Sequence, residues 1–140
     1  MKTRLFFAII CTVAAVAGSN ALEWPVAEVR PGRFFAQRAE NSIERGITLE
    51  NAEIVRSAGN GTLVFSMKQN RNMSGFPGTL GNAVIIAHDD SILSVYGNLD
   101  SLERLDTRTT VETGTILASA GTSGWTKRGA LLFQVVDQER

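Results

Sequence analysis

Short apolar runs separated by glycine turns are the feature that most constrains the fold of this chain. From Gly46 onward, β-branched and aromatic residues gather in short runs, and Gly, Asn or Asp stands between them. Many such runs divided by turn residues are typical of antiparallel sandwiches and barrels. The sequence therefore predicts an all-β fold, in which an antiparallel β-sheet forms a sandwich or barrel-like domain with long surface loops.

The turn residues indicate how the expected strands follow one another. Asn60-Gly61, before the run at residues 62–66, is a hairpin signal. The runs at residues 83–88 and 91–97 flank Asp89-Asp90, and we expect them to pair as a second hairpin. The stretch between these hairpins is polar and rich in Gly and Asn, so it predicts a long surface loop.

Two further segments and an apolar core complete the expected fold. Leu99, Leu102 and Leu105 recur every three residues, which favours one helical turn. The sequence also predicts a strand pair folded about Gly114, over residues 111–119. The space between the sheet layers is expected to be filled by apolar side chains from these runs, namely Val84, Ile86, Leu93, Val95, Ile116, Leu131, Phe133 and Val135.

The first residues have the pattern of a secretory signal. Positive residues precede the apolar run at residues 5–17, and Ser19 and Ala21 have the spacing of a signal peptidase site. We therefore expect residues 1–21 to be a cleaved signal peptide and the protein to be periplasmic or secreted. Retention as a membrane anchor is the alternative, although the run is short for a bilayer span of about 20 residues.

The remaining chain is long enough for one compact domain. We divide it into an extended lead-in over residues 22–43 and a domain over residues 44–140. Cys11 lies in the signal, so no cysteine remains for a disulfide or a metal site. The signal also contains two of the 14 basic residues, which leaves two fewer basic than acidic residues. Neither this charge nor the hydropathy indicates binding to nucleic acid, binding to an anionic membrane or a stable membrane span.

Several of these runs occur together, and in the same order, in one family. Residues 44–140 resemble the LytM/lysostaphin-type zinc metalloendopeptidases, whose domain has a duplicated hybrid motif and cuts peptidoglycan. The resemblance is carried by residues 46–47, 61–64, 81–88, 94–99, 111–118, 121–124 and 131–135. It implies an exported cell-wall protein with an all-β peptidase-like fold.

The resemblance also implies where a catalytic zinc would be held. In the family, an HxGxD pattern and an HxHF pattern supply three ligands and leave one position open for water. The corresponding residues here are Glu44, Thr48 and Leu132. Leucine has no lone pair to donate, and one carboxylate beside a threonine does not complete a zinc site. We therefore expect neither a metal nor another cofactor.

The proton-handling positions of the family have changed as well. Ala130 stands where a His would assist the attacking water, and Asn98 stands where a His would stabilise the transition state. General acid–base catalysis needs a titratable group at such positions. We predict a degenerate homologue without peptidase activity. An enzyme of another kind, or one with an improvised metal site, is an alternative that the ligand set argues against.

A vestigial groove is the candidate binding surface. Five residues expected at this groove are types that dominate protein interfaces or that bind glycans, namely Arg45, Tyr96, Trp125, Lys127 and Arg128. Small or polar residues at Thr48, Asn98 and Ala130 are expected to leave the groove open.

Other interpretations of these residues compete with the open groove. Leu132 and Tyr96 can plug it, Trp125 can lie on the sheet, and Arg45 can place its own charge in the metal site. His88 is the single histidine of the chain. We expect His88 to pack or to hydrogen-bond, and not to act in catalysis.

Inactive members of this family are similar to known regulators that bind and activate a cell-wall amidase. The first hypothesis is therefore a factor that regulates or scaffolds peptidoglycan remodelling through its vestigial groove. The second is a module that binds a peptidoglycan peptide and has no regulatory role. One departure weakens the first hypothesis, because such activators usually carry a coiled coil or a glycan-binding module that this sequence lacks.

Overall fold

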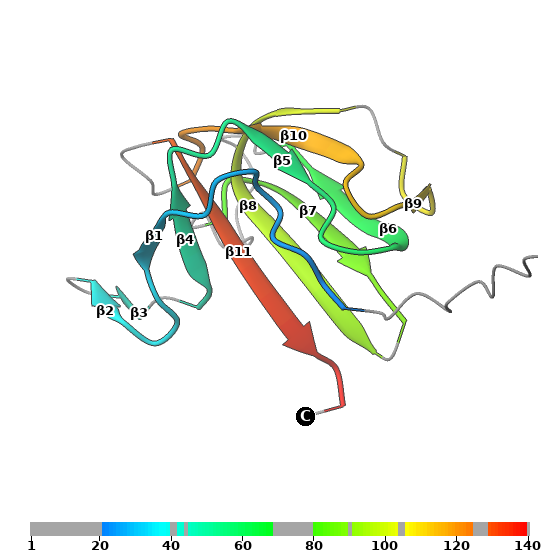
Figure 1. Cartoon of the computed structure of the whole chain (residues 1–140), viewed down its shortest axis with the longest axis horizontal. Coiled ribbons are helices and arrows are strands. Elements are labelled where there is room, and N and C mark those ends of the chain that lie inside the picture. The colour runs from blue at the N-terminus through cyan, green and yellow to red at the C-terminus, as the bar shows by residue number, and fades with distance from the viewer. Residues whose placement is uncertain are drawn as a thin grey trace, which may run out of the picture.

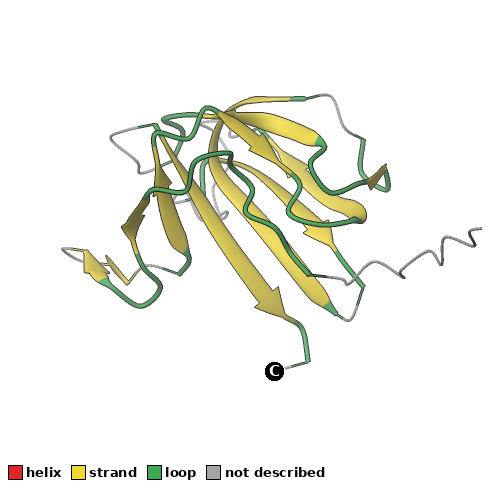
Figure 2. Cartoon of the chain, viewed as in Figure 1, coloured by secondary structure: helices red, strands yellow, loops and turns green. Residues whose placement is uncertain are grey.

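The computed structural model describes residues 21–39, 42–43, 45–68, 80–89, 91–103, 106–124 and 129–139. Every regular element in these ranges is a β-strand (Figure 2). Within the same ranges, no helix has the length and apolar character needed to cross a membrane. The predicted signal peptide, apart from Ala21, lies outside the described residues, as does most of the predicted long loop.

The strands follow one another closely along the chain (Figure 1). They are β1 (Pro31–Arg33), β2 (Arg38–Ala39), β3 (Ser42–Ile43), β4 (Ile47–Glu50), β5 (Ile54–Arg56), β6 (Gly61–Met67), β7 (Asn82–Ala87), β8 (Ile92–Leu102), β9 (Thr110–Val111), β10 (Ile116–Ala120) and β11 (Ala130–Asp137).

Nine of these strands form one antiparallel sheet, while β2 and β3 pair separately. The main path of the sheet runs in the order β1-β4-β11-β8-β7-β6-β9, and β10 joins β5 to β8 off this path. In Figure 1, β5 and β10 cross over the main path, so the sheet forms two layers. The expected all-β antiparallel fold is confirmed, as is the hairpin of β7 and β8. The hairpin predicted at Asn60-Gly61 does not form, because β5 pairs with β10 and β6 pairs with β7 and β9.

The long strand β8 belongs to both layers because it bends at Asn98. Its first half pairs with β11 as far as Gly97, and its second half pairs with β10 from Leu99 onward. Asn98 has a φ of 60°, a left-handed conformation that Asn tolerates better than most residues. Its N–H donates to Leu80 O (2.6 Å), and its carbonyl accepts from Gly121 N (2.9 Å).

Two sequence-based expectations near this bend are wrong. Leu99 and Leu102 lie in β8 and not in a helical turn, because pairing with β10 fixes an extended backbone. Leu105 lies outside the described residues. Residues 111–119 do turn at Gly114, whose φ is 84°. The flanking strands do not pair with each other, however, since β9 pairs with β6 and β10 pairs with β5 and β8.

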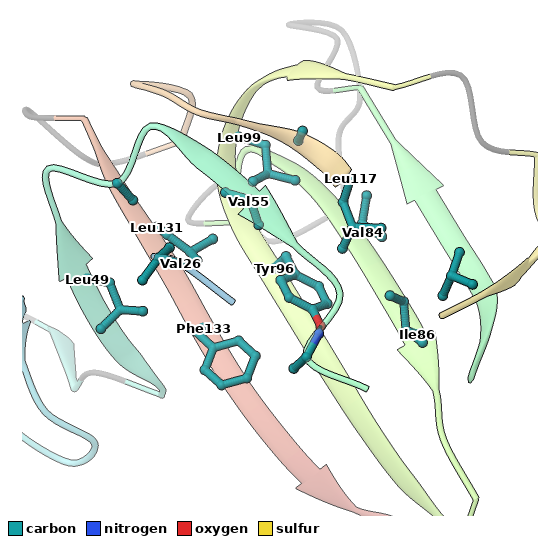
Figure 3. Close-up of a cluster of buried hydrophobic side chains, with 14 of the residues drawn as sticks. Val26, Leu49, Val55, Val84, Ile86, Tyr96, Leu99, Leu117, Leu131 and Phe133 are labelled. Carbon is teal, nitrogen blue, oxygen red and sulfur yellow. Dashed lines mark hydrogen bonds between the residues drawn. The ribbon is translucent and has the colours of Figure 1, made fainter. Parts of the chain in front are cut away.

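The core lies between the two layers. Val55 of β5 and Leu117 of β10 gather with Val84, Tyr96 and Leu131 from the main path (Figure 3). All five are at most 2% exposed. Burying an aliphatic or aromatic side chain of this size contributes roughly 1.5–3 kcal/mol, so this cluster is a major source of stability.

The strand register corrects the predicted core. Val84 faces the core in the same row as Tyr96, whereas Val95 is buried as predicted, at 7% exposed, but pairs with Ile85 and points to the opposite face. Leu93 is one residue from Ser94 and shares that opposite face. Ile116 and Val135 are 42% and 48% exposed. Successive residues of a strand alternate between faces, so an apolar run cannot place all its side chains in one core.

The lead-in packs along this core. Glu23 N donates to Ala58 O (2.7 Å), and Arg56 N donates to Pro25 O (2.9 Å). Val26 is buried, and the Trp24 ring lies 6.5 Å from the Phe133 ring. The segment after the predicted cleavage site therefore covers one side of β11.

We expect Phe133→Ala to lower the free energy of unfolding by about 3–5 kcal/mol, because it opens a cavity beside two aromatic rings. Phe133 is 7% exposed, and its ring centroid is 5.5 Å from that of Tyr96. Val135→Ala, on the same face of β11 but half exposed, is the matched control and changes stability far less. Urea denaturation measures both, and equal effects would contradict the register of β11.

Candidate functional site

Two of the expected metal positions are direct neighbours in the sheet. Thr48 of β4 pairs with Leu132 of β11, which in turn pairs with Gly97 of β8. The next row along β11 contains Ile47, Phe133 and Tyr96. Residues that pair directly share a face of the sheet, and adjacent rows face opposite ways. Thr48 and Leu132 thus meet on the face of the main path that points away from the core.

Apolar atoms occupy the space around this pair. A Cβ atom added at Gly46 would lie 3.2 Å from Leu132 Cδ1, and one added at Gly97 would lie 3.5 Å from Leu132 Cβ and 3.2 Å from Leu80 Cδ2. The same atom at Gly46 would lie only 2.5 Å from Phe133 O, so the close approach of the two strands requires glycine there.

These residues do not fit a zinc ion. Thr48 offers a neutral hydroxyl and Leu132 offers only methyl groups, whereas zinc sites use thiolate, imidazole or carboxylate ligands. Among the described residues, no three His, Cys, Asp or Glu side chains are grouped so as to hold a metal ion. Glu44, the remaining expected metal position, lies outside the described residues. No catalytic step through a metal can be derived from this donor set.

The two expected proton-handling positions are both buried. Ala130 is two residues from Leu132 on β11 and is 3% exposed, and Asn98 at the bend of β8 is 7% exposed. Thr48 is 8% exposed. These short side chains thus lie below the surface, while the open concave site expected above them stays a prediction, since its rim at residues 125–128 lies outside the described residues.

The expected groove residues divide into three groups. Arg45, just before β4, is exposed. Trp125, Lys127 and Arg128 lie outside the described residues. Tyr96 does not belong to the groove, because it is fully buried on the core face of β8 and its ring packs against Phe133. It therefore neither binds a partner nor plugs the site.

Tyr96 instead takes part in a buried polar network that the sequence did not predict. Its hydroxyl accepts from Ala58 N–H (2.8 Å) and hydrogen-bonds Ser94 Oγ (2.9 Å). Ser94 Oγ lies 2.7 Å from His88 Nε2, and His88 Nδ1 lies 2.7 Å from Asn60 O. The signal was the spacing of Ser94 and Tyr96, which puts both on one face of a strand.

This network gives His88 a structural role. Both ring nitrogens have partners, so His88 links the turn at Asn60 to the centre of β8. The prediction that it hydrogen-bonds is confirmed. Burial raises the pKa of Tyr96, and hydrogen bonds to Ser94, Ala58 and Ser57 lower it in part. The phenol therefore stays protonated beyond the pH at which a free tyrosine ionises.

Comparison with known sequences decides the family. The profile of peptidase family M23 matches residues 42–140. The chain belongs to peptidase family M23. The resemblance to LytM/lysostaphin-type enzymes is thereby confirmed for most of the chain, including β4, β8 and β11 at the candidate site.

One curated relative of this M23 chain is an uncharacterized protein of Treponema pallidum (strain Nichols). It is 28% identical over 144 residues, which cover 95% of this chain and 98% of the relative. The two chains therefore correspond over nearly their whole lengths.

Solved structures share the M23 fold. A zinc-containing peptidase from Vibrio cholerae is similar with a TM-score of 0.70 and 21% identity, over 86% of this chain and 38% of its own. Lysostaphin from Staphylococcus simulans is similar with a TM-score of 0.68 and 16% identity, over 86% of this chain and 48% of its own. A chain in the complex of SpoIIIAH and SpoIIQ is similar with a TM-score of 0.64 and 17% identity, over 83% of this chain and 92% of its own. This chain thus spans less than half of the two peptidases.

We expect the stability of the protein to fall steeply at alkaline pH because of Tyr96. The pKa of Tyr96 is higher in the folded state than in the unfolded state, where it is about 10. The contribution of Tyr96 to stability is therefore fully present below about pH 10 and is lost as the pH rises through its folded-state pKa. The chain has one tyrosine. Phenolate absorbance therefore reports Tyr96 alone, and it should appear only together with unfolding.

Tyr96→Phe is the control for this alkaline effect. It should be less stable at neutral pH, because Ala58 N–H loses its buried acceptor, but should lack the Tyr96 contribution to alkaline unfolding. Reversible titration of the phenol near pH 10 in the folded protein would contradict the buried network.

We also expect the purified chain to contain no stoichiometric zinc and to cleave neither peptidoglycan nor glycine-rich peptides, because Thr48 and Leu132 cannot bind the ion. Elemental analysis and a digestion assay measure this. The combined variant Glu44→His, Thr48→Asp and Leu132→His restores the family donors and should gain zinc. One tightly held zinc per unmodified chain, lost together with activity on chelation, would contradict this prediction.

Proposed function

We propose that this chain is a non-catalytic M23 protein of the cell envelope that regulates or scaffolds peptidoglycan remodelling by binding a cell-wall hydrolase, an amidase being the best candidate. The observation that carries the proposal is the direct pairing of Thr48 with Leu132. Two positions that would hold zinc lie side by side, as catalysis would need, yet leucine fills one of them.

The intact frame around this site supports a binding role. β4, β11 and β8 pair in continuous register beneath Thr48 and Leu132. The bend of β8 is also tied to β7, since Asn82 Nδ2 donates to Leu99 O (2.9 Å) and to Asp100 O (3.0 Å). A rigid surface without catalytic groups is suited to recognition.

The comparisons support a protein as the partner. The SpoIIIAH and SpoIIQ structure is a complex of two proteins, and the chain matched in it covers 83% of this one with the same fold. In this proposal the hydrolase contacts the rim of the filled site, where Arg45 is exposed and Trp125, Lys127 and Arg128 are expected. Export through the signal at residues 1–21 would bring the protein to the peptidoglycan layer.

Direct binding of a peptidoglycan peptide is the alternative. It needs an accessible cleft, and burial of Thr48, Asn98 and Ala130 weighs against one at these side chains. Purified murein sacculi distinguish the two: a peptide-binding module is retained on sacculi alone, whereas a hydrolase partner is required in the regulatory case.

We expect the double variant Arg45→Glu with Arg128→Glu to lose its hydrolase partner in crosslinked pull-downs from the native envelope, and to fail to restore a deletion strain. Reversing two cations at the rim introduces repulsion where a charged partner surface is recognised. The matched control is Lys68→Glu with Arg108→Glu, which makes the same charge change beside β6, three strands away from β11.

Both double variants should melt at the temperature of the unmodified protein. If the rim variant folds, keeps its partner and restores the deletion strain fully, binding takes place on another face.

A further inference from the structure

The turn between β1 and β2 presents two phenylalanine side chains to solvent. Phe34 is 58% exposed and Phe35 is 70% exposed, more than any other large apolar side chain in the described part of the chain. Figure 1 places β1, β2 and β3 at the side of the molecule, beyond β4. These two adjacent rings therefore lie outside the core, and exposed apolar side chains that stand together often mark sites of interaction.

The backbone of this turn is closed by its own hydrogen bonds. Gln37 N donates to Phe34 O (3.1 Å), and Phe34 N donates to Gln37 Oε1 (3.1 Å). Ala36 completes the turn with a φ of 63°. Backbone groups that enter an apolar medium without a partner are costly, so a closed turn can leave water more readily than an open loop.

Cations flank the two rings. Arg33 and Arg38 are exposed, one on each side of the turn. Arg30 is paired with Glu28 at 2.6 Å, and the Glu50 side chain lies against Gly32 at the base of the turn. Arg33 and Arg38 thus adjoin the aromatic tip along the chain, Arg33 with a contact inside the chain as well, and the Glu50 carboxylate lies at the base of the turn. The small net charge of the whole chain conceals this local arrangement.

We propose that this turn docks the protein on the surface of an anionic lipid bilayer. Phe34 and Phe35 enter the boundary between headgroups and acyl chains, and Arg33 and Arg38 face the lipid phosphates. Apolar side chains inserted to this depth, together with flanking cations, are sufficient for reversible binding to anionic membranes.

A lipid surface suits this turn better than a protein partner does. A stable protein interface buries about 800 Å² on each side, with a packed centre. A four-residue turn with two rings provides much less contiguous area. A bilayer requires no complementary pocket, because its interface accommodates any small apolar tip. Docking of this kind is reversible and involves no membrane-spanning segment.

The test is sedimentation of the exported, purified chain with vesicles of phosphatidylglycerol and phosphatidylethanolamine, and with vesicles of phosphatidylcholine alone. We expect binding to the anionic vesicles that weakens as salt is raised, and little binding to the neutral ones. Phe34→Ser with Phe35→Ser should reduce binding at least tenfold. Arg33→Gln with Arg38→Gln should reduce it mainly at low salt.

Ile54→Ser with Val135→Ser removes exposed apolar side chains elsewhere and should bind as the unmodified chain does. Equal melting temperatures exclude misfolding of the variants. Binding that is absent, or unchanged in the Phe34 and Phe35 variant, would overturn the proposal. So would a dimer in light scattering that the same variant dissolves, since the turn would then bind a second copy. The assay contains neither peptidoglycan nor hydrolase, so its result is independent of the proposed function.

Discussion

The register of β11 between β4 and β8 is the constraint on which the rest of the structure depends. It puts Phe133 beside Tyr96 in the core and Leu132 beside Thr48 on the other face. A slip by one residue would exchange these rows and expose the aromatic pair. The same pairing therefore sets both the core and the candidate site, and neither can change its geometry without the other.

Apolar packing and hydrogen bonds hold the described part of this fold together. The buried cluster draws on both layers, and each buried side-chain polar atom in the described residues has a hydrogen-bond partner. Asn98 stands where the family enzymes have a catalytic histidine. Here its backbone turns β8 from one layer of the sheet into the other. The residue is thus explained by chain geometry and needs no chemical role.

Much of the fold could be predicted from the sequence, since the turns at Asn60-Gly61 and Asp89-Asp90 delimit strands through local chemistry. The face that each side chain takes could not be predicted as well. Val95 and Tyr96 are neighbours in one run and both are buried, and only pairing with β7 and β11 decides which of them faces the cluster between the two layers. For the site, the resemblance indicated which residues stand at the metal and proton-handling positions of the family. It could not indicate that Thr48 and Ala130 are buried, because their burial depends on distant segments of the chain.

The pairing of Thr48 with Leu132 also has a consequence for single substitutions at the site. A single change of Leu132 to histidine would place an imidazole beside the backbone of Gly46 and Gly97, at a partly buried position of β11. A polar group in such surroundings lowers stability until its partners are present. A change of Leu132 alone therefore brings no compensating interaction, and only a simultaneous change at Thr48, its partner in the sheet, would give the imidazole a charged neighbour.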